Sequence, residues 1–473
     1  MHTELLIGGK WIATAKRAPV LNKYSGATIA ETSVAEQKDV AAAVAAAQAA
    51  FEKGPPGAYA RYKVLDKAAD LLEARRAEFI DTIVKEAGFT ASDAAGECGR
   101  AAETLRLSAE EAKRITGEML PIDGAPGQGN RLGFTLRVPV GVVCAITPFN
   151  SPLNTVMHKV APALAAGNAV VLKPASYTPL TSALLCEILV EAGVPEGYIN
   201  LLHGSGGSVG KWLLAESAVR FYTFTGSTEV GKWIQSAAGL RRTQMECGSI
   251  ASTIICADAD IERAIPRILA ATFRKAGQVC TSIQRLYVEQ SIFDSFSERF
   301  VAAVKKDAIA GDPSNNKTFV GPLIDPREAD RVAGWVSEAR KLGANVLTGG
   351  ERDGYAVMQP AVISKVNEQM DVFSREAFGP LVCLVPFTKF EDCVRSVNAT
   401  PYGLATGVFT NDLQRAFYAA QKIDVGGIHI NETASSRVDL MPYGGMKESG
   451  FGREGPRYAI REMTEEKVIT ISL

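Results

Sequence analysis

Three side chains whose chemistry suits acyl transfer lie far apart in the sequence. Cys280 stands in "RKAGQVCTSIQ", Glu246 in "TQMECGSIAS", and Asn150 shortly after a predicted strand in "ITPFNSPLN". A thiolate can attack a carbonyl carbon, a desolvated carboxylate can act as a general base, and an amide can donate to an oxyanion. These are residue types used in nucleophilic catalysis.

Each of these residues also has an ordinary structural interpretation. Cys280 is one of eight cysteines, and free cysteines are commonly buried and inert, so taken alone it is more often a small hydrophobe. Glu246 could form a buried salt bridge, and Asn150 could simply form a turn. Glu376, in "REAFGPLV", could be a plain loop carboxylate. Residue type alone therefore leaves both interpretations open.

Glycines and a lysine at predicted strand ends could hold a nucleotide. "FYTFTGSTEVGKWI" places Gly226, Ser227 and Gly231 where an apolar strand meets a helix start, so free N–H groups and the helix dipole could meet a pyrophosphate. Lys173, in "VVLKPASYTP", could bind ribose hydroxyls or phosphate, or only mark the end of a strand. "HGSGGSVG" (203–210) lacks the full GxGxxG spacing, which favours a flexible turn.

Alternating strands and helices predict how these residues are positioned. Between about 35 and 114 the apolar residues repeat at helical spacing. From 141 to 226 apolar strands such as "VGVVCAIT" and "NAVVLKP" alternate with amphipathic helices, which indicates a parallel sheet covered on both faces. A doubly wound sheet of this type binds ligands at the carboxyl ends of its strands. A second α/β series runs from 252 to 430.

The remaining segments indicate an arm. The region from 117 to about 141 is rich in Gly and Pro with a short alternating stretch, and the tail "EEKVITISL" reads as a strand that could pair with another subunit. The predicted division is a dinucleotide-binding domain over 1–116 and 138–246, a second α/β domain over 247–457, and an arm formed by 117–137 and 458–473.

Composition excludes several classes of function. The 473 residues include 51 basic and 52 acidic side chains, so net charge favours neither nucleic acid nor membrane surfaces. The eight cysteines form no CxxC pair, and the four histidines show no metal-ligand spacing, so no metal site is expected. No export signal or transmembrane run is recognisable, and reduced thiols suit the cytoplasm.

Eight motifs in order resemble those of the aldehyde dehydrogenase superfamily over essentially the whole chain. They are "TPFNSP", "VLKPAS", "FTGSTEVGK", "MECGS", "GQVCTS", "EAFGPLV", "NATPYGLATGVFT" and "PYGGMKESGFGREG". The resemblance implies a Rossmann-type cofactor domain, an α/β catalytic domain and a β oligomerisation arm. The arm near residues 117 to 137 and the terminal strand suggest a homodimer or homotetramer.

The resemblance assigns catalytic roles. Cys280 would attack the aldehyde as a thiolate, and the resulting oxyanion would be held by the Asn150 amide and the Cys280 backbone N–H. After hydride transfer to NAD(P)+, Glu246 would activate water to hydrolyse the thioester. A CoA-acylating relative would usually lack this carboxylate, and a non-catalytic structural relative would not need all three residues. Hydrolytic release is therefore favoured.

The resemblance also assigns cofactor residues. Lys173 would contact the adenosine ribose, Glu376 the nicotinamide ribose, and Phe378 would pack near the nicotinamide ring. The full expected set is Thr147, Pro148, Phe149, Lys173, Ser176, Gly226, Ser227, Val230, Glu376 and Phe378. NAD-preferring relatives commonly carry Glu where this chain has Ser176, and losing that carboxylate removes its repulsion of a 2′-phosphate. NADP should thus be tolerated or preferred. Cys247, beside Glu246, is another departure and is interpreted as a packing residue.

Three basic side chains indicate the substrate class. Arg100 falls in a helix whose family counterpart lines the substrate tunnel, His158 lies two turns beyond Asn150, and Arg437 falls in the loop that closes the tunnel mouth. Each could also be an ordinary surface or helix-capping charge. Together they resemble the pattern of relatives that oxidise short aldehydes with an anionic tail, and the motif style is also close to lactaldehyde and succinate-semialdehyde dehydrogenases. The expected substrate is a small anionic or hydroxylated aldehyde.

Overall fold

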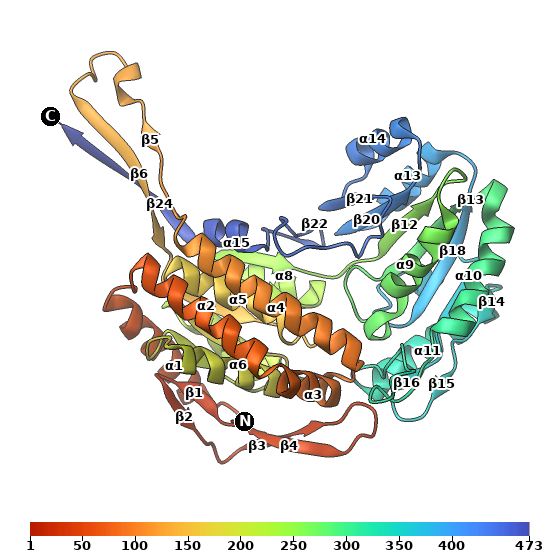
Figure 1. Ribbon diagram of the computed structural model, residues 1–473, viewed down its shortest axis with the longest axis horizontal. Coiled ribbons are helices and arrows are strands. Elements are labelled where there is room, and N and C mark those ends of the chain that lie inside the picture. The colour runs from red at the N-terminus through yellow and green to blue at the C-terminus, as the bar shows by residue number, and fades with distance from the viewer. Residues whose placement is uncertain (473) are drawn as a thin grey trace.

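The computed structural model describes residues 1–472 and contains two large sheets joined to a projecting arm (Figure 1). The first sheet has the strand order β2-β1-β9-β8-β7-β10-β11-β23. Its bounds are β1 Leu5–Ile7, β2 Lys10–Ile12, β7 Val142–Ile146, β8 Ala169–Lys173, β9 Ile199–Leu201, β10 Val219–Thr225, β11 Arg242–Glu246 and β23 Gly450–Phe451. The strands from β9 to β11 are parallel, which confirms the predicted doubly wound arrangement.

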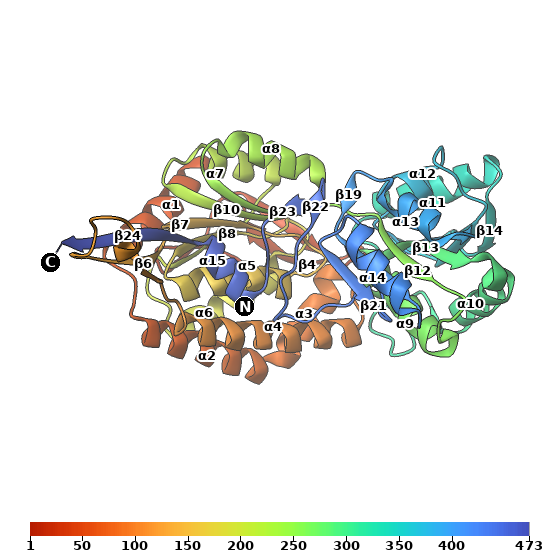
Figure 2. The same cartoon turned by 90° about the horizontal axis from the view of Figure 1, so that it is seen from above.

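Helices cover both faces of this sheet, as seen from above in Figure 2. One face carries α1 (Gln37–Glu52), α7 (Lys211–Ala215) and α8 (Thr228–Ala238). The other carries α5 (Asn154–Ala166) and α6 (Pro179–Ala192), with α2 (Ala58–Ala74), α3 (Arg76–Ala87) and α4 (Ala91–Ala112) outside them. Strands β7 and β8 are buried along their whole length, because both of their faces are covered.

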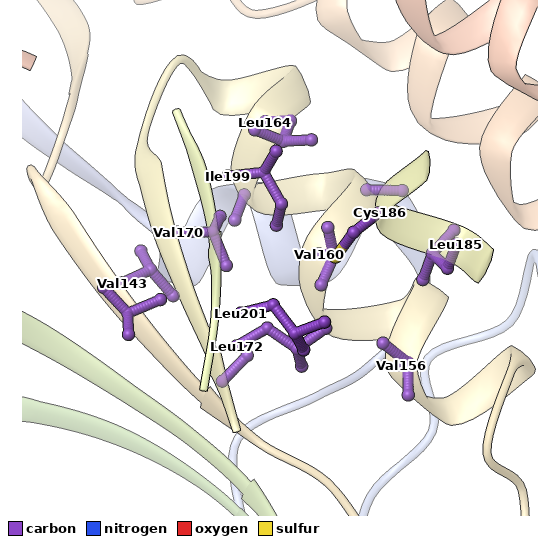
Figure 3. Close-up of a cluster of buried hydrophobic side chains, with 14 of the residues drawn as sticks. Val143, Val156, Val160, Leu164, Val170, Leu172, Leu185, Cys186, Ile199 and Leu201 are labelled. Carbon is purple, nitrogen blue, oxygen red and sulfur yellow. The ribbon is translucent and has the colours of Figure 1, made fainter. Parts of the chain in front are cut away.

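The core of this lobe lies between the parallel strands and helices α5 and α6 (Figure 3). Its aliphatic side chains interdigitate across the layers, and Cys186 packs among them as a small hydrophobe. The labelled members are Val143, Val156, Val160, Leu164, Val170, Leu172, Leu185, Cys186, Ile199 and Leu201. This packed layer fixes the strand ends at which the polar residues lie.

The second sheet has the order β14-β17-β18-β13-β12-β20-β21. Its strands are β12 Ala251–Ile255, β13 Ile283–Glu289, β14 Asn345–Thr348, β17 Ala361–Ser364, β18 Leu381–Phe387, β20 Ala405–Phe409 and β21 Gly427–Ile430. Two separate cores form on its faces: Ile255 packs toward α9 (Ile261–Phe273) and α10 (Phe293–Asp307), and Ile254 toward α13 (Phe390–Asn398) and α14 (Leu413–Lys422). Successive strand residues thus serve opposite faces. Helices α11 (Pro326–Lys341) and α12 (Asp371–Ser374) complete this lobe.

The arm is a three-stranded antiparallel sheet that projects from the first lobe in both views (Figures 1 and 2). It contains β5 (Met119–Leu120), β6 (Arg131–Pro139) and β24 (Thr464–Ser472), in the order β24-β6-β5. The tail strand β24 pairs with β6 of the same chain along its whole described length, from Thr464 opposite Pro139 to Ser472 opposite Arg131. Its other edge has no partner strand within residues 1–472.

The chain returns from the second lobe to the first before it enters the arm. Strands β19 (Tyr402–Gly403) and β22 (Met446–Lys447) pair with each other, β23 pairs with β11, and α15 (Pro456–Glu462) packs on α4 and α5. Strand β23 and helix α15 thus contact the first lobe, whereas β22 pairs with β19. A short hairpin, β3 (Arg17–Leu21) with β4 (Thr28–Ser33), and the pair β15 (Arg352–Asp353) with β16 (Val357–Met358) complete the strands.

Candidate active site

Cys280 lies in a tightly constrained turn between α9 and β13. Three consecutive residues before it, Lys275, Ala276 and Gly277, adopt left-handed backbone angles with φ of 53°, 56° and 69°. A side chain at Gly277 would place its Cβ 2.2 Å from the backbone oxygen of Gly379, so only glycine fits. Cys280 is partly exposed, whereas every other cysteine is buried. Exposure therefore separates the predicted nucleophile from the packing cysteines.

The Cys280 thiol faces a tyrosine hydroxyl. Its Sγ lies 3.1 Å from Oη of Tyr443. Burial raises the pKa of the thiol to about 11, the Tyr443 hydrogen bond opposes that rise, and the nearby carboxylate of Glu246 adds to it. The backbone N–H of Cys280 has no hydrogen-bond partner among residues 1–472. It is free to donate to a bound oxygen.

Glu246 ends β11 at the carboxyl edge of the first sheet. Its side chain is buried, and neither carboxylate oxygen has a hydrogen-bond partner in the described part of the chain. Burial raises the pKa of Glu246 well above its usual value, and the nearby carboxylate of Glu454 raises it further. A buried carboxyl group without partners is costly for folding, which points to a functional role.

Glu454, and not Glu246, forms ion pairs with the two nearby cations, Lys159 and Arg437. Lys159 Nζ donates to Oε1 of Glu454 at 2.9 Å, and Arg437 Nη2 donates to Oε2 at 3.0 Å. Burial favours the neutral acid, but these two cations outweigh it and hold the pKa of Glu454 at about 2. Of two neighbouring buried carboxyl groups, one is thus locked as an anion and the other is free to exchange a proton.

Asn150 is held in place through its backbone. Its carbonyl oxygen accepts a hydrogen bond of 2.9 Å from Nζ of Lys275, and its side-chain amide has no hydrogen-bond partner among the described residues. The same Lys275 ammonium donates to Glu97 at 2.6 Å. Glu97, on α4, also accepts the backbone N–H groups of Leu153 and Asn154 at 2.8 and 3.2 Å.

This Glu97–Lys275 clamp joins three segments: α4, the turn that leads into α5, and the turn that carries Cys280. Both charged side chains are buried, with 2% and 8% of their surfaces exposed. The clamp therefore connects Asn150 to the chain five residues before Cys280. Sequence reasoning missed it, because the two partners are 178 residues apart and neither belongs to a recognisable motif.

The predicted cofactor residues gather along the carboxyl edge of the first sheet. Lys173 ends β8, and its buried ammonium donates only to the carbonyl of Pro174 at 2.9 Å within the described chain. Burial lowers the pKa of Lys173 to about 8. Ser176 is exposed and donates to the carbonyl of Gly204 at 2.9 Å, which brings the glycine-rich loop 203–210 beside it. Thr147 Oγ1 is buried without a partner among residues 1–472.

The start of α8 offers further donors. Ser227 caps the helix by accepting the N–H of Val230 at 3.4 Å, and Val230 is 40% exposed. Gly226 precedes the cap, and a Cβ there would lie 2.6 Å from the Phe224 ring. The first N–H groups of this helix have no intrahelical partners and suit an anion. Unpaired donors on a sheet edge, beside an uncompensated lysine, fit the phosphates and ribose hydroxyls of a dinucleotide.

Residues from the second lobe face this edge. Phe149, next to Pro148, packs edge-on against Phe378, with ring centroids 5.8 Å apart. Oε1 of Glu376 accepts the backbone N–H of Ser249 at 2.9 Å, and burial raises the pKa of Glu376 to about 7. The structure therefore brings the predicted nicotinamide-side residues of both lobes to one place.

The three predicted substrate residues are all engaged by carboxylates. Arg100 donates to Asp439 through Nε at 3.0 Å and Nη2 at 2.7 Å, and His158 Nε2 lies 2.7 Å from Oδ1 of the same residue. Burial and the Arg437 charge lower the pKa of His158. Burial disfavours the Asp439 anion, but its hydrogen bonds to His158 and Arg100 outweigh burial and hold the pKa of Asp439 far below its usual value. Arg437 binds Glu454. That these three side chains meet an anionic substrate stays a prediction, and each of them already has a carboxylate partner within the described chain.

A fourth basic residue, missed by sequence reasoning, has no carboxylate hydrogen-bonded to it within residues 1–472. Arg274 donates to Oγ of Ser435 at 2.9 Å and forms no ion pair within the described chain. Ser435 Oγ also lies 3.0 Å from Oγ1 of Thr281, the residue after Cys280. Burial lowers the pKa of the Arg274 guanidinium, the nearby Asp93 carboxylate opposes this shift, and the Arg100 charge adds to it. Its position six residues before Cys280 was the signal that could have found it.

Two kinds of feature are absent from residues 1–472. No cluster of three or more His, Cys, Asp or Glu side chains suited to a metal ion is present among them. None of their helices combines the length and the apolar character needed to cross a membrane.

Comparison with known proteins identifies the family. The model of the aldehyde dehydrogenase family matches residues 11–469. This chain belongs to the aldehyde dehydrogenase family. A 3-sulfolactaldehyde dehydrogenase from Priestia aryabhattai is 48% identical over 469 residues, covering 99% of this chain and 98% of that protein. The aldehyde dehydrogenase is therefore an oxidoreductase that acts on the aldehyde group of its substrate.

Solved structures agree with this identification. An aldehyde dehydrogenase from Physcomitrella patens, in complex with the reaction product succinate, superposes with a TM-score of 0.96 at 38% identity, covering 99% of this chain and 98% of that one. A glyceraldehyde-3-phosphate dehydrogenase from Methanocaldococcus jannaschii, complexed with NADP, superposes with a TM-score of 0.93 at 35% identity, covering 97% and 100%. The fold class and family predicted from the sequence are confirmed.

Proposed function

We propose that this aldehyde dehydrogenase oxidises a small anionic aldehyde to its carboxylic acid, with NAD(P)+ as the hydride acceptor and Cys280 as the nucleophile. The observation that supports the substrate class most strongly is Arg274, which lies beside the Cys280 turn and forms no ion pair within residues 1–472. The roles of the individual residues follow from their partners, or from the absence of partners within residues 1–472.

Cys280 and Asn150 carry the first half of the reaction. The Cys280 thiolate forms a bond to the aldehyde carbon, and the carbonyl π electrons move to oxygen, giving a thiohemiacetal. The Asn150 amide and the Cys280 N–H, which have no partners within residues 1–472, would donate to that oxygen. The cofactor, when bound, accepts the hydride that leaves this carbon. The product on the enzyme is a thioester of Cys280.

Glu246 carries the second half. Its partner-free carboxylate removes a proton from water as the water oxygen attacks the thioester carbon, and the C–S bond then breaks to release the acid. Its raised pKa strengthens it as a base. The presence of this carboxylate supports hydrolysis over transfer of the acyl group to CoA.

The cofactor is proposed to be NAD+ or NADP+, with NADP+ tolerated or preferred. Lys173 and the N-terminus of α8 would hold the adenosine ribose and the phosphates, and Glu376 and Phe378 the nicotinamide side. Ser176 is a neutral donor at the position that would face the 2′ group, and the cationic Lys173 ends the strand just before it. The NADP complex of the Methanocaldococcus jannaschii relative is consistent with this proposal.

The anionic end of the substrate is proposed to bind Arg274, with Arg100 and the hydroxyl groups of Ser435 and Thr281 nearby. The 48% identical relative is named for a sulfonated aldehyde, and the Physcomitrella patens structure contains succinate, so both relatives handle short molecules with an anionic end. In this chain Arg274 has the charge to bind such a group without displacing a protein carboxylate.

A kinetic panel tests the proposal. The wild-type enzyme should show higher kcat/KM for sulfo-, phosphono- and carboxy-aldehydes than for propanal, and Arg274→Met should reduce only the efficiencies on the anionic aldehydes. We expect a loss of about tenfold to a hundredfold, because a charge-assisted hydrogen bond contributes about 1.5–3 kcal/mol. Arg395→Met, at an exposed position on α13, is the matched control. Equal efficiency on propanal and the anionic aldehydes would exclude this substrate class.

The assembly is proposed to be a homodimer or a homotetramer built through the arm. The open edge of β24 could extend a sheet of a second copy, which would remove an exposed strand edge. Sedimentation of the intact chain against a variant that ends before Thr464 would test this. A wild-type monomer would refute it.

A further inference from the structure

We propose that Tyr443 is a catalytic residue whose phenolic O–H donates a hydrogen bond to the Cys280 thiolate and so increases the fraction of the nucleophile that is ionised before attack. This inference rests on the proposed role of Cys280 as nucleophile. The contact that carries it is the distance of 3.1 Å between Tyr443 Oη and Cys280 Sγ. Apart from this sulfur, the hydroxyl has no hydrogen-bond partner among residues 1–472.

The backbone of Tyr443 is fixed, so the hydroxyl cannot easily move away. Tyr443 and Glu454 form an isolated antiparallel bridge in which each N–H donates to the other carbonyl, at 3.1 and 2.7 Å. Glu454 is itself held by Lys159 and Arg437. Tyr443 is buried, with 9% of its surface exposed. The phenol is therefore placed by the same segment that contains the locked carboxylate.

A cation lies against the Tyr443 ring. The guanidinium carbon of Arg437 is 3.8 Å from the ring centroid, and Glu454 anchors the guanidinium through Nη2 at 3.0 Å. A cation on the face of a phenol draws electron density from the ring, which makes the hydroxyl a stronger donor. Arg437 thus assists the nucleophile through Tyr443, a role different from the predicted direct contact with substrate.

The other charged groups around the thiol divide into two sets. Glu246, from β11, and Glu376, from the segment before β18, disfavour a negative sulfur, whereas Arg437 and Arg274 favour it. Burial also disfavours the thiolate. Among these neighbours of the thiol, only Tyr443 donates a direct hydrogen bond to the sulfur. Its removal should leave the thiol protonated over a wider pH range.

No proton leaves Tyr443 in this account. The hydroxyl donates to the thiolate, and when the C–S bond forms the negative charge moves from sulfur to the aldehyde oxygen. Sulfur then becomes a poor acceptor, so the hydrogen bond weakens and does not hold the thiohemiacetal back. The contribution of Tyr443 is therefore confined to populating the attacking form, and it is largest below the thiol pKa.

The test is the pH dependence of iodoacetamide alkylation at Cys280 in the intact chain, without cofactor. Tyr443→Phe removes one oxygen, and we expect the apparent pKa of the thiol to rise by about one unit, with a roughly tenfold slower alkylation below that pKa and little change above it. The kcat/KM for aldehyde should follow the same profile. Tyr458→Phe, at a half-buried position on α15, is the matched control, and Cys280→Ala measures background alkylation.

An alkylation profile that Tyr443→Phe leaves unchanged would overturn the proposal. A loss of rate that is equal at every pH would also overturn it, because it would indicate a packing role only. The alkylation measurement does not require turnover, so it is separate from the proposed function. That function fails instead if Cys280→Ala retains aldehyde oxidation.

Discussion

Two buried clusters of this enzyme use the same kinds of groups in opposite ways. In the Glu97–Lys275 clamp, the carboxylate accepts an ammonium and two backbone N–H groups, so its lone pairs are well occupied. In the proposed reaction centre, which consists of Cys280, Glu246 and Asn150, the Glu246 carboxylate has no partner and the Asn150 amide is equally free within residues 1–472.

The difference distinguishes residues that position the chain from residues that remain available to react or to bind substrate. A satisfied buried ion pair fixes the geometry of the chain around it but has no capacity left to bind a substrate. An unsatisfied group costs folding free energy and gains its partner only when substrate or water arrives. Because Lys275 bonds to the backbone of Asn150, the clamp positions the reaction centre without taking part in it.

Removing the free carboxylate should have the largest effect on turnover. Glu246→Gln keeps the shape but cannot accept a proton, so we expect kcat to fall by about 10²–10⁴-fold, with one equivalent of NAD(P)H still released in a rapid first turnover. Stopped-flow absorbance would measure both phases. Glu97→Gln is the matched comparison, since it should lower stability without separating a burst from a slow steady state. Loss of the burst in Glu246→Gln would contradict a role limited to deacylation.

Lowering the pH should reduce kcat in the same way as the substitution Glu246→Gln. Burial and Glu454 raise the pKa of Glu246, and the base acts only as a carboxylate, so kcat should decline as the pH falls through this raised pKa and recover above it. A pH profile of kcat would locate the decline well above pH 4.5, the usual value for this side chain. A decline at the ordinary value would mean that the buried environment described for Glu246 is incorrect.

Breaking the clamp should act mainly on stability. Lys275→Met leaves Glu97 buried without its cation, and we expect a loss of about 3–5 kcal/mol in the free energy of unfolding, measured by urea denaturation. The double variant Glu97→Gln/Lys275→Met should recover much of that loss, since no charge remains unpaired. If the single variant is as stable as the wild type, the clamp does not hold the two turns.

A substitution at the proposed cofactor site should have a smaller effect on kinetics. Ser176→Glu places a carboxylate where the 2′ group is proposed to bind, so kcat/KM for NADP+ should fall about tenfold or more relative to that for NAD+. Ser176→Gln is the uncharged control. An unchanged ratio of the two efficiencies would place the 2′ group elsewhere.

Removing an exposed ion pair should have the smallest effect on stability. It therefore provides a reference for the stability lost when the Glu97–Lys275 clamp is broken. Lys85 and Asp81 lie one helical turn apart on α3, bonded at 2.6 Å, but they are 50% and 61% exposed. Lys85→Met should change the free energy of unfolding by about 0.5 kcal/mol or less, because water already solvates both charges. A loss as large as that of Lys275→Met would remove burial as the explanation of the difference.

The sequence predicts the helices, strands and sheets of this enzyme better than the side-chain contacts between distant residues. Unbroken apolar strands such as 169–173 and helices that end in glycine are local signals, and they predicted the parallel sheets. The pair Cys280–Tyr443 spans 163 residues and the clamp spans 178, so no local pattern indicates them. The lowered pKa of His158 was missed for a related reason, since burial beside Arg437 is a property of the folded chain.

The central claim is that Cys280 forms the acyl intermediate which Glu246 then hydrolyses. The most direct measurement is mass spectrometry of Glu246→Gln after incubation with aldehyde and NAD(P)+, followed by peptide mapping, with Glu246→Gln/Cys280→Ala as the matched control. The account predicts a mass increase equal to the acyl group, on the peptide containing Cys280 and absent from the control. An acyl group on another residue, or an equal one in the control, would contradict it.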